Sequence, residues 1–445
     1  MAPLSTILAE PLKLPCGVVV PNRLVKAALT EGLADEWNRA TDELCTLYRG
    51  WSEEGCGLLI TGNVQVDRNF MERAGNVAID GPQSRDSLCR LENFAAAAKS
   101  GGSLVFMQIG HAGRQTEKRV NKHAVGPSGI AFDDANPEAP SDCTTRALSF
   151  REILDIQTRF VQAALVAKQC GFDGVQIHSA HGYLLSSFLN PLANQRDDSF
   201  GGSLENRSRL LLDTISEVRK AVGTTYPVSV KINSADFQKG GFSVEECEQV
   251  AHWLDLAGID FLELSGGNYE NPVLVTGSWK NPGTNQSSIR REAYFLEFAD
   301  GIRRALKNTP LMVTGGFRSK AFMEKCLTAG DCNLIGVGRP LCGGMHKVCK
   351  KLLAGEILVL PEYEHSLLFP WWAYPLFLFK IGAVMKFALQ QMWYYHNTIL
   401  LAAGKETAYY RNFWHFLKVR SYDNNKAMRL KELDCEGYVH RPQKK

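Results

Sequence analysis

Eight short apolar runs alternate with helix-like segments between Val25 and Gly355, and this alternation constrains the fold more than any other feature. The runs are almost continuously hydrophobic, as expected for parallel strands that are covered on both faces. A strand–helix order repeated eight times predicts an α/β fold of the (β/α)8 TIM-barrel type. The predicted strands are Leu24–Leu29, Leu58–Thr61, Leu104–Ile109, Val175–His178, Val228–Asn233, Phe261–Ser265, Leu311–Thr314 and Leu334–Val337.

The segments between the runs carry helix signals. Residues 151–170 place apolar side chains at alternating steps of three and four, which predicts one buried stripe. Ser149 and Glu152 form a capping-box pattern at the start of this helix, and Ser243 and Glu246 repeat the pattern before another. These patterns fix where two helices of the barrel should begin.

Two connections are much longer than the usual few residues. They run over residues 110–149 and 266–291, and both leave the C-terminal end of a predicted strand. Active sites of TIM barrels lie at that end, so we expect both loops to cover the active site. Residues 11–21 precede the first strand and are expected to form a small hairpin that closes the opposite end.

The motif His178-Ser-Ala-His181-Gly-Tyr183 follows the apolar run Val175–Ile177 directly. Two imidazoles at a strand end can converge on one oxygen atom, and a phenol beside them can donate a proton. The motif therefore predicts a site that polarises a carbonyl group. His-x-x-His can also be a metal pair, but no carboxylate or cysteine follows at a matching spacing, so no metal site is predicted.

A second block, Arg-Asp-Asp-Ser-Phe-Gly-Gly-Ser-Leu-Glu-Asn-Arg, spans residues 196–207. Its charged and glycine residues are interpreted mainly as structural groups that fix the loop after the fourth strand. Ser203 is expected near the start of the following helix.

Polar and small residues stand at the ends of the other predicted strands. Glycines after the seventh and eighth strands let backbone amides approach a phosphate, and an arginine there can bind it. A lysine within the apolar fifth strand needs a buried partner. The residues at these strand ends include Ala28, Thr30, Gly62, Gln108, Lys231, Gly315, Gly316, Gly338 and Arg339.

Together, the histidine–tyrosine motif, the block through Arg207 and these strand ends resemble the Old Yellow Enzyme family of flavin-dependent ene-reductases. The resemblance runs from the N-terminus to about residue 355. It implies FMN as the cofactor and assigns these nine strand-end residues, Ala28 among them, to FMN binding. It implies that Thr30 meets the flavin C4 carbonyl, that Gln108 meets the pyrimidine edge, that Gly62 lets the ring pack closely, and that Lys231 lies near N1 and the C2 carbonyl. The four residues of the phosphate corner, Gly315, Gly316, Gly338 and Arg339, would hold the phosphate.

The same resemblance implies a reaction in two halves. NADPH or NADH reduces the flavin and leaves, and an activated alkene (an enone or enal) or a quinone takes its place. His178 and His181 would hold the carbonyl oxygen while hydride moves from flavin N5, and Tyr183 would donate the proton. The segment Glu31-Gly32 lacks an aromatic residue that some relatives place against the substrate, so the preferred acceptor stays open.

Two other functions compete with this interpretation. Lys231 could act as a Schiff-base nucleophile in an aldolase-type barrel. Alternatively, the barrel could be a scaffold that binds a membrane or a protein partner through its C-terminal region.

The character of the chain changes after about residue 358, so we expect a barrel over 1–358 and an aromatic-rich, helical extension over 359–445. The apolar run at 367–379 is too short to cross a bilayer. Residues 387–403 suit an amphipathic helix. Helices packed on the barrel or on a second copy are favoured over a membrane-surface anchor. The sequence leaves self-association open.

The composition argues against several classes of protein. The net charge is only +3, which does not favour a nucleic-acid partner. The 12 cysteines are scattered without a Cys-x-x-Cys pair, which argues against a disulfide framework and against a compact zinc or iron–sulfur site. The first 15 residues lack a long apolar core, so no signal peptide is predicted and a cytoplasmic location is expected.

Overall fold

The computed structural model describes residues 6–131, 144–236, 239–265, 300–363, 380–407 and 414–430. Eight parallel strands among these residues form a barrel in the order β4-β3-β13-β12-β11-β10-β9-β6, and β4 pairs with β6 to close it. The strands are β3 (Leu24–Lys26), β4 (Leu58–Ile60), β6 (Leu104–Gly110), β9 (Gly174–Ser179), β10 (Val228–Asn233), β11 (Leu262–Ser265), β12 (Leu311–Thr314) and β13 (Leu334–Val337). Each coincides with a predicted run, so the TIM-barrel prediction is confirmed.

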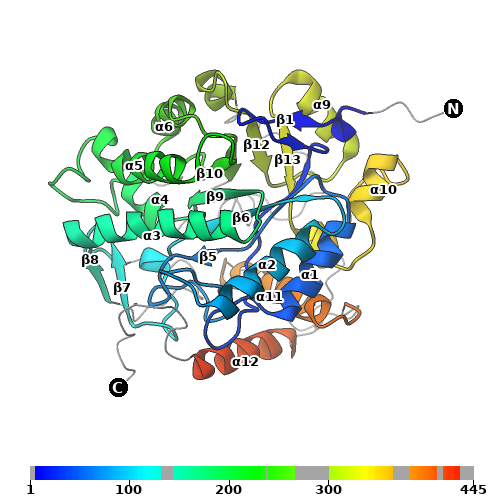
Figure 1. Ribbon diagram of the computed structural model, residues 1–445, viewed down its shortest axis with the longest axis horizontal. Helices are drawn as coiled ribbons and strands as arrows, with labels where there is room; N and C mark the ends of the chain where they lie inside the picture. The colour runs from blue at the N-terminus through cyan, green and yellow to red at the C-terminus, as the bar shows by residue number, and fades with distance from the viewer. Residues whose placement is uncertain are drawn as a thin grey trace.

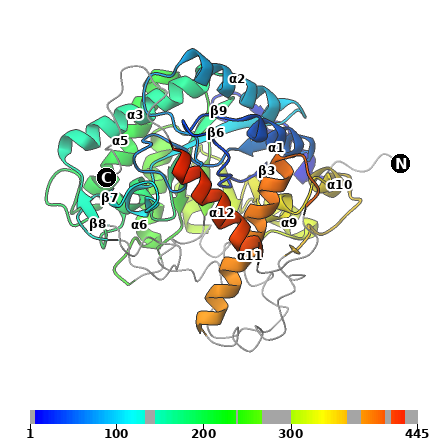
Figure 2. The ribbon, with the colours of Figure 1, turned by 90° about the horizontal axis from the view of Figure 1, so that it is seen from below.

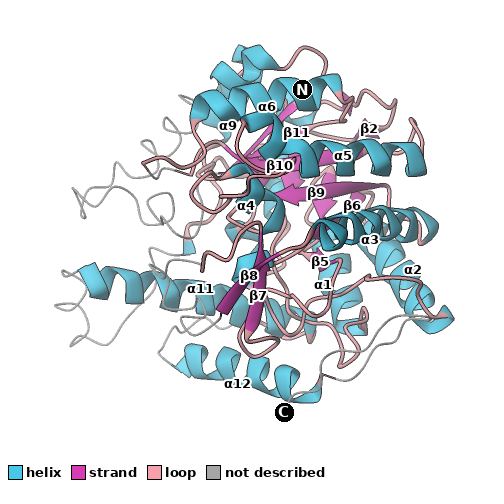
Figure 3. Ribbon diagram, turned by 90° about the vertical axis from the view of Figure 1, so that its left-hand side faces the viewer, coloured by secondary structure: helices cyan, strands magenta, loops and turns pink. Residues whose placement is uncertain are grey.

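Helices surround the strands as an outer layer (Figures 1 and 3). They are α1 (Asp42–Glu53), α2 (Arg85–Lys99), α3 (Phe150–Gln169), α4 (Leu184–Leu189), α5 (Leu204–Val222), α6 (Val244–Leu256), α9 (Lys320–Ala329) and α10 (Val348–Ala354). Both predicted capping boxes are present, at Ser149 and Glu152 of α3 and at Ser243 and Glu246 of α6. Ser203 caps α5, as expected.

The predicted N-terminal hairpin is also present. It follows a short helix, η1 (Ile7–Ala9), and pairs β1 (Leu12–Lys13) with β2 (Val19–Val20). Leu14 and Val20 are buried in one apolar cluster with residues inside the barrel, among them Phe106 and Phe261, whose rings stack at 5.7 Å. The hairpin therefore fills the end of the barrel where the strands begin.

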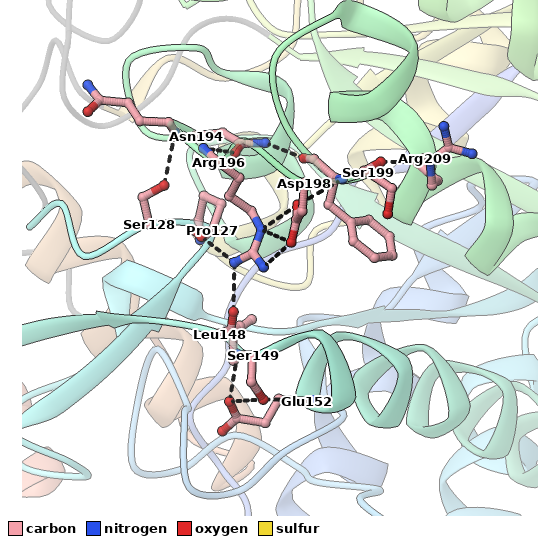
Figure 4. A network of polar contacts seen from close by, with 12 residues as sticks. Pro127, Ser128, Leu148, Ser149, Glu152, Asn194, Arg196, Asp198, Ser199 and Arg209 are labelled. Carbon is pink, nitrogen blue, oxygen red and sulfur yellow. Dashed lines mark hydrogen bonds and ion pairs between the residues drawn. The ribbon is translucent and has the colours of Figure 1, made fainter.

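The loop after β6 contains a short helix, η2 (Gly113–Gln115), and two short parallel strands, β7 (His123–Gly126) and β8 (Thr144–Ala147). Arg196 holds this loop against the one that follows β9 (Figure 4). Its guanidinium donates to the carbonyls of Pro127 and Leu148 at 2.8 and 2.6 Å and pairs with Asp198. This confirms the structural interpretation of the Arg-Asp-Asp block. The second long loop, 266–291, lies outside the described residues.

The C-terminal part contains two helices, α11 (Lys380–Ala402) and α12 (Trp414–Arg429). They pack on each other at the end of the barrel opposite the hairpin (Figures 1 and 2). α11 also contacts α1 and η3 (Arg339–Cys342), the turn that follows β13. Within the described ranges, no helix is long and apolar enough to cross a membrane. The boundary at residue 358 stays a prediction.

Candidate active site

The C-terminal strand ends and α11 enclose one cavity, and eight of the predicted residues line it. These are Ala28, Thr30, Gln108, His178, His181, Tyr183, Lys231 and Arg339. Four predicted glycines, Gly62, Gly315, Gly316 and Gly338, do not line the cavity. Seven lining residues were not predicted: Leu29, Asn63, Cys342, Gln391, Tyr394, Tyr395 and Thr398.

The histidine–tyrosine motif lies where β9 ends. Every residue of β9 is buried, and the strand delivers His178 to the cavity. His181 adopts a left-handed backbone conformation with φ of 62°, which turns the chain so that its ring meets that of His178. The ring centres of His178 and His181 are 5.2 Å apart, and the Tyr183 ring lies 4.9 Å from His178 and 6.5 Å from His181. The three side chains face the same space.

Hydrogen bonds fix both histidines. The Nδ1 atom of His178 accepts a hydrogen bond from the Ala180 amide at 3.2 Å, so in the neutral ring the hydrogen is on Nε2. The His181 amide donates to Asn233 Oδ1 at 2.8 Å, at the end of β10. The His181 Nε2 atom lies 2.7 Å from the Ser265 hydroxyl, at the end of β11. Asn233 and Ser265 therefore orient His181 from two adjacent strands.

Both imidazoles are held in the neutral form. Burial lowers the pKa of His178 well below its usual value, and the nearby His181 and Lys231 lower it further. Burial and Lys231 lower the pKa of His181 in the same way. Neutral rings can donate hydrogen bonds to an oxygen without giving up a proton. The pair is thus suited to stabilising negative charge that develops on a substrate oxygen.

Lys231 has a buried partner that the sequence analysis did not identify. Its Nζ atom lies 2.9 Å from Glu263 Oε1, and the two side chains are 4% and 0% exposed. Gln176 donates to the same carboxylate at 2.8 Å and accepts from Gln108 at 2.7 Å. A chain of polar groups thus crosses β6, β9, β11 and β10. An ion-paired ammonium serves charge stabilisation, whereas a Schiff-base nucleophile must be a free amine.

Gly62 has a structural role in the barrel wall. Its amide donates to Glu31 Oε1 at 2.8 Å. A Cβ atom at this position would lie 2.1 Å from the other Glu31 carboxylate oxygen and 2.4 Å from the Leu29 carbonyl oxygen. Any larger residue would displace the segment after β3, which carries Thr30. The predicted contact of Gly62 with a flavin ring stays a prediction.

The phosphate corner lies after β12 and β13. Gly315 and Gly316 follow β12 with φ of 130° and 75°, conformations that favour glycine. Gly338 directly precedes η3, whose first residue, Arg339, lines the cavity. The described lining residues include two cations, Lys231 and Arg339, and no carboxylate. This donor set fits FMN, whose phosphate and reduced ring are anionic. The assignment of Arg339 to the phosphate and of Lys231 to the ring stays a prediction.

Four lining residues come from α11, far outside the motifs. Gln391, Tyr394, Tyr395 and Thr398 are spaced at i, i+3, i+4 and i+7 and therefore share one helix face. The pattern is visible in the sequence, but it is typical of any helix that packs on a core. Nothing in it indicates that the surface it meets is an active site.

Comparisons with known proteins identify the family and agree with the fold. The model of the NADH:flavin oxidoreductase / NADH oxidase family matches residues 8–344. An NADH-dependent flavin oxidoreductase of Hypocrea jecorina is 36% identical over 342 residues, which cover 74% of this chain and 85% of the relative. An NADH oxidase of Thermoanaerobacter brockii is 33% identical over 340 residues, covering 73% of this chain and 47% of the relative, so this chain spans about half its length.

Solved structures support the fold. An Old Yellow Enzyme homologue from Zymomonas mobilis superposes with a TM-score of 0.65 at 24% identity, covering 80% of this chain and 95% of the homologue. Morphinone reductase in complex with tetrahydroNAD gives a TM-score of 0.64 at 23% identity, covering 80% and 92% of the two chains. The chain therefore shares the fold of the Old Yellow Enzyme homologue and belongs to the NADH:flavin oxidoreductase / NADH oxidase family, with FMN as its cofactor and NADH or NADPH as its reductant.

Proposed function

We propose that this enzyme reduces an activated carbon–carbon double bond, in an enone or enal, or a quinone. The observation that carries the proposal is the cluster of His178, His181 and Tyr183 around one space, in a cavity that also holds the Lys231 side chain. Such a cluster can hold a carbonyl oxygen and supply a proton close to it. Those are the two tasks that reduction of an enone requires from a protein.

The residues divide these tasks as follows. His178 donates from Nε2, and His181 donates from its ring, to the acceptor's carbonyl oxygen, where negative charge develops. FMN, held by residues such as Arg339 and Lys231, would supply the hydride when it is bound. Tyr183 donates its hydroxyl proton to the α-carbon, which completes the two-electron reduction to a saturated carbonyl compound. Lys231, paired with Glu263, adds a buried positive charge to the cavity.

Phenol binding tests the proposal. A phenolate resembles the enolate-like oxygen that the two histidines would hold, and we expect a long-wavelength charge-transfer band when a phenol is titrated into the FMN-loaded enzyme. His178→Ala and His181→Ala should each weaken phenol binding at least about tenfold, since each removes a hydrogen bond to a charged oxygen. Unchanged dissociation constants in both variants would exclude the pair as the oxygen-binding site. A cytoplasmic location and self-association stay predictions.

A further inference from the structure

The wall of the cavity opposite the strand ends comes from α11, a helix outside the residues that the family model matches. We call Gln391, Tyr394, Tyr395 and Thr398 the α11 face. These side chains line the same cavity as His178, His181 and Tyr183. The α11 face therefore lies where it can contact an acceptor that those three residues hold.

Packing holds this face in place. Trp393 and Tyr394 are buried with Cys342 of η3 in one cluster, and the Trp393 ring lies 5.7 Å from that of Tyr363. Asn397 is completely buried on the same stretch of helix. Because α11 is buried here against the turn that carries Arg339, its side chains form a defined wall of the cavity.

Arg73, which forms an ion pair with Asp423 of α12, contacts the ring of Tyr395 and holds it in place. Arg73, from the loop after β5 (Val64–Gln65), stacks its guanidinium 4.5 Å from the centre of the Tyr395 ring. The same guanidinium pairs with Asp423 of α12 at 2.9 Å, and both side chains are at most 10% exposed. It also donates to the Glu31 carbonyl at 3.3 Å, just beyond Thr30.

The path of Arg73 requires a glycine. A Cβ atom at Gly32 would lie 2.7 Å from the guanidinium carbon, and Gly32 has φ of 71°. The Arg73 side chain thus lies next to the segment that follows β3 and links this segment to α11 and α12. The position of Tyr395 in the cavity depends on both C-terminal helices.

We propose that the α11 face selects the acceptor, and that Arg73 and Asp423 are positioning residues that hold Tyr395 in that face. This inference rests on the proposed function and extends it to substrate class. The described lining combines three tyrosines with amide side chains and has no carboxylate. It suits a planar, oxygen-bearing acceptor, such as a quinone or cyclic enone, and the Tyr395 ring in this face favours a single-ring acceptor over one with a second fused ring.

The first experiment compares two acceptors that differ by one fused ring. The ratio of kcat/KM for 1,4-naphthoquinone to that for 1,4-benzoquinone is measured per bound FMN in the wild-type enzyme and in Tyr395→Ala. We expect the ratio to rise at least about tenfold in the variant, the low end of the effect of changing a pocket by one methylene or more. A ratio within twofold of wild type would overturn the selecting role of Tyr395.

The second experiment separates positioning from stability. Asp423→Asn should raise the same ratio in the same direction as Tyr395→Ala, and Asp423→Glu should restore it in part. The matched control is Asn425→Asp, an exposed change of one charge on the same helix, which should leave the ratio unchanged. If Asp423→Asn lowers only the unfolding temperature and leaves the ratio at the wild-type value, the positioning role is wrong.

A third measurement keeps this inference distinct from the proposed function. Dissociation constants of phenol and 2-naphthol are measured with the oxidised, FMN-loaded enzyme, without turnover. If no alkene or quinone oxidises the reduced wild-type enzyme, the proposed function fails, but the ligand ratio still tests the α11 face. Tyr395→Ala should then improve 2-naphthol binding relative to phenol, and an unchanged ratio would refute the inference.

Discussion

Breaking the buried Lys231–Glu263 pair from one side should lower the free energy of unfolding by a large, measurable amount. Glu263→Gln keeps the volume of the side chain and an oxygen that can accept from Gln176, but it removes the charge that faces Lys231 at 2.9 Å. The ammonium is only 4% exposed, so water cannot replace the lost partner. Breaking one side of a buried pair costs about 3–5 kcal/mol because the other charge stays buried and uncompensated.

Urea unfolding of the FMN-saturated enzyme measures this change. Two controls define the result. Glu217→Gln breaks an exposed pair with Lys220 and should change stability by less than about 1 kcal/mol. The double variant Lys231→Met/Glu263→Gln removes both charges and should be much more stable than the sum of the single losses predicts. A loss below about 1 kcal/mol in Glu263→Gln, or strict additivity in the double variant, would refute the buried ion pair.

Three further predictions concern other parts of the molecule. Arg339→Ala should be purified with clearly less FMN than wild type at similar thermal stability, measured by absorbance per protein, because Arg339 is the cation of the phosphate corner; full occupancy would contradict this role. Arg196→Met should lower the free energy of unfolding by about 2–4 kcal/mol in urea, since it leaves two carbonyls without their donor and removes the charged partner of Asp198; a loss within error would contradict it. Burial and, to a smaller extent, Arg159 lower the pKa of His111 to about 3. Below about pH 6.5 the unfolded chain therefore binds a proton at His111 while the folded protein does not. Because of this difference, the free energy of unfolding falls as the pH decreases. His111→Gln should therefore lose about 2 kcal/mol less stability than wild type between pH 7 and pH 5, and equal pH slopes would contradict this assignment.

The sequence predicted most of the barrel because local patterns determine it. All eight apolar runs became barrel strands, since residues buried on both faces leave a continuous hydrophobic signal. The capping residues Ser149 and Ser243 fixed helix starts through contacts only three residues away. The positions of His178, Lys231 and Arg339 in or after predicted strands also predicted that they share one site, because the C-terminal ends of parallel barrel strands lie at the same end of the barrel.

The features that the sequence analysis missed depend on contacts between distant segments. Glu263 appeared as one charged residue within an apolar strand, and only the register of β10 beside β11 shows that it faces Lys231. The partnership of Arg73 and Asp423 spans 350 residues and leaves no local signal. Tyr395 belongs to a helical stripe that looks like any packed face until the helix is placed on the barrel.

Single-turnover oxidation of the reduced enzyme tests the central claim, that His178, His181 and Tyr183 activate an acceptor and protonate it. Reduced wild type and Tyr183→Phe are mixed rapidly with 2-cyclohexenone and, separately, with 1,4-benzoquinone. Tyr183→Phe should keep its FMN and its phenol binding and should slow oxidation by the enone about 10²–10⁴-fold, the usual contribution of a positioned acid. Oxidation by the quinone should slow little, since its reduced product is a stable anion that solvent protonates later. Equal slowing with both acceptors would mean that Tyr183 positions the substrate and does not donate the proton, and an unchanged enone rate would contradict its role altogether.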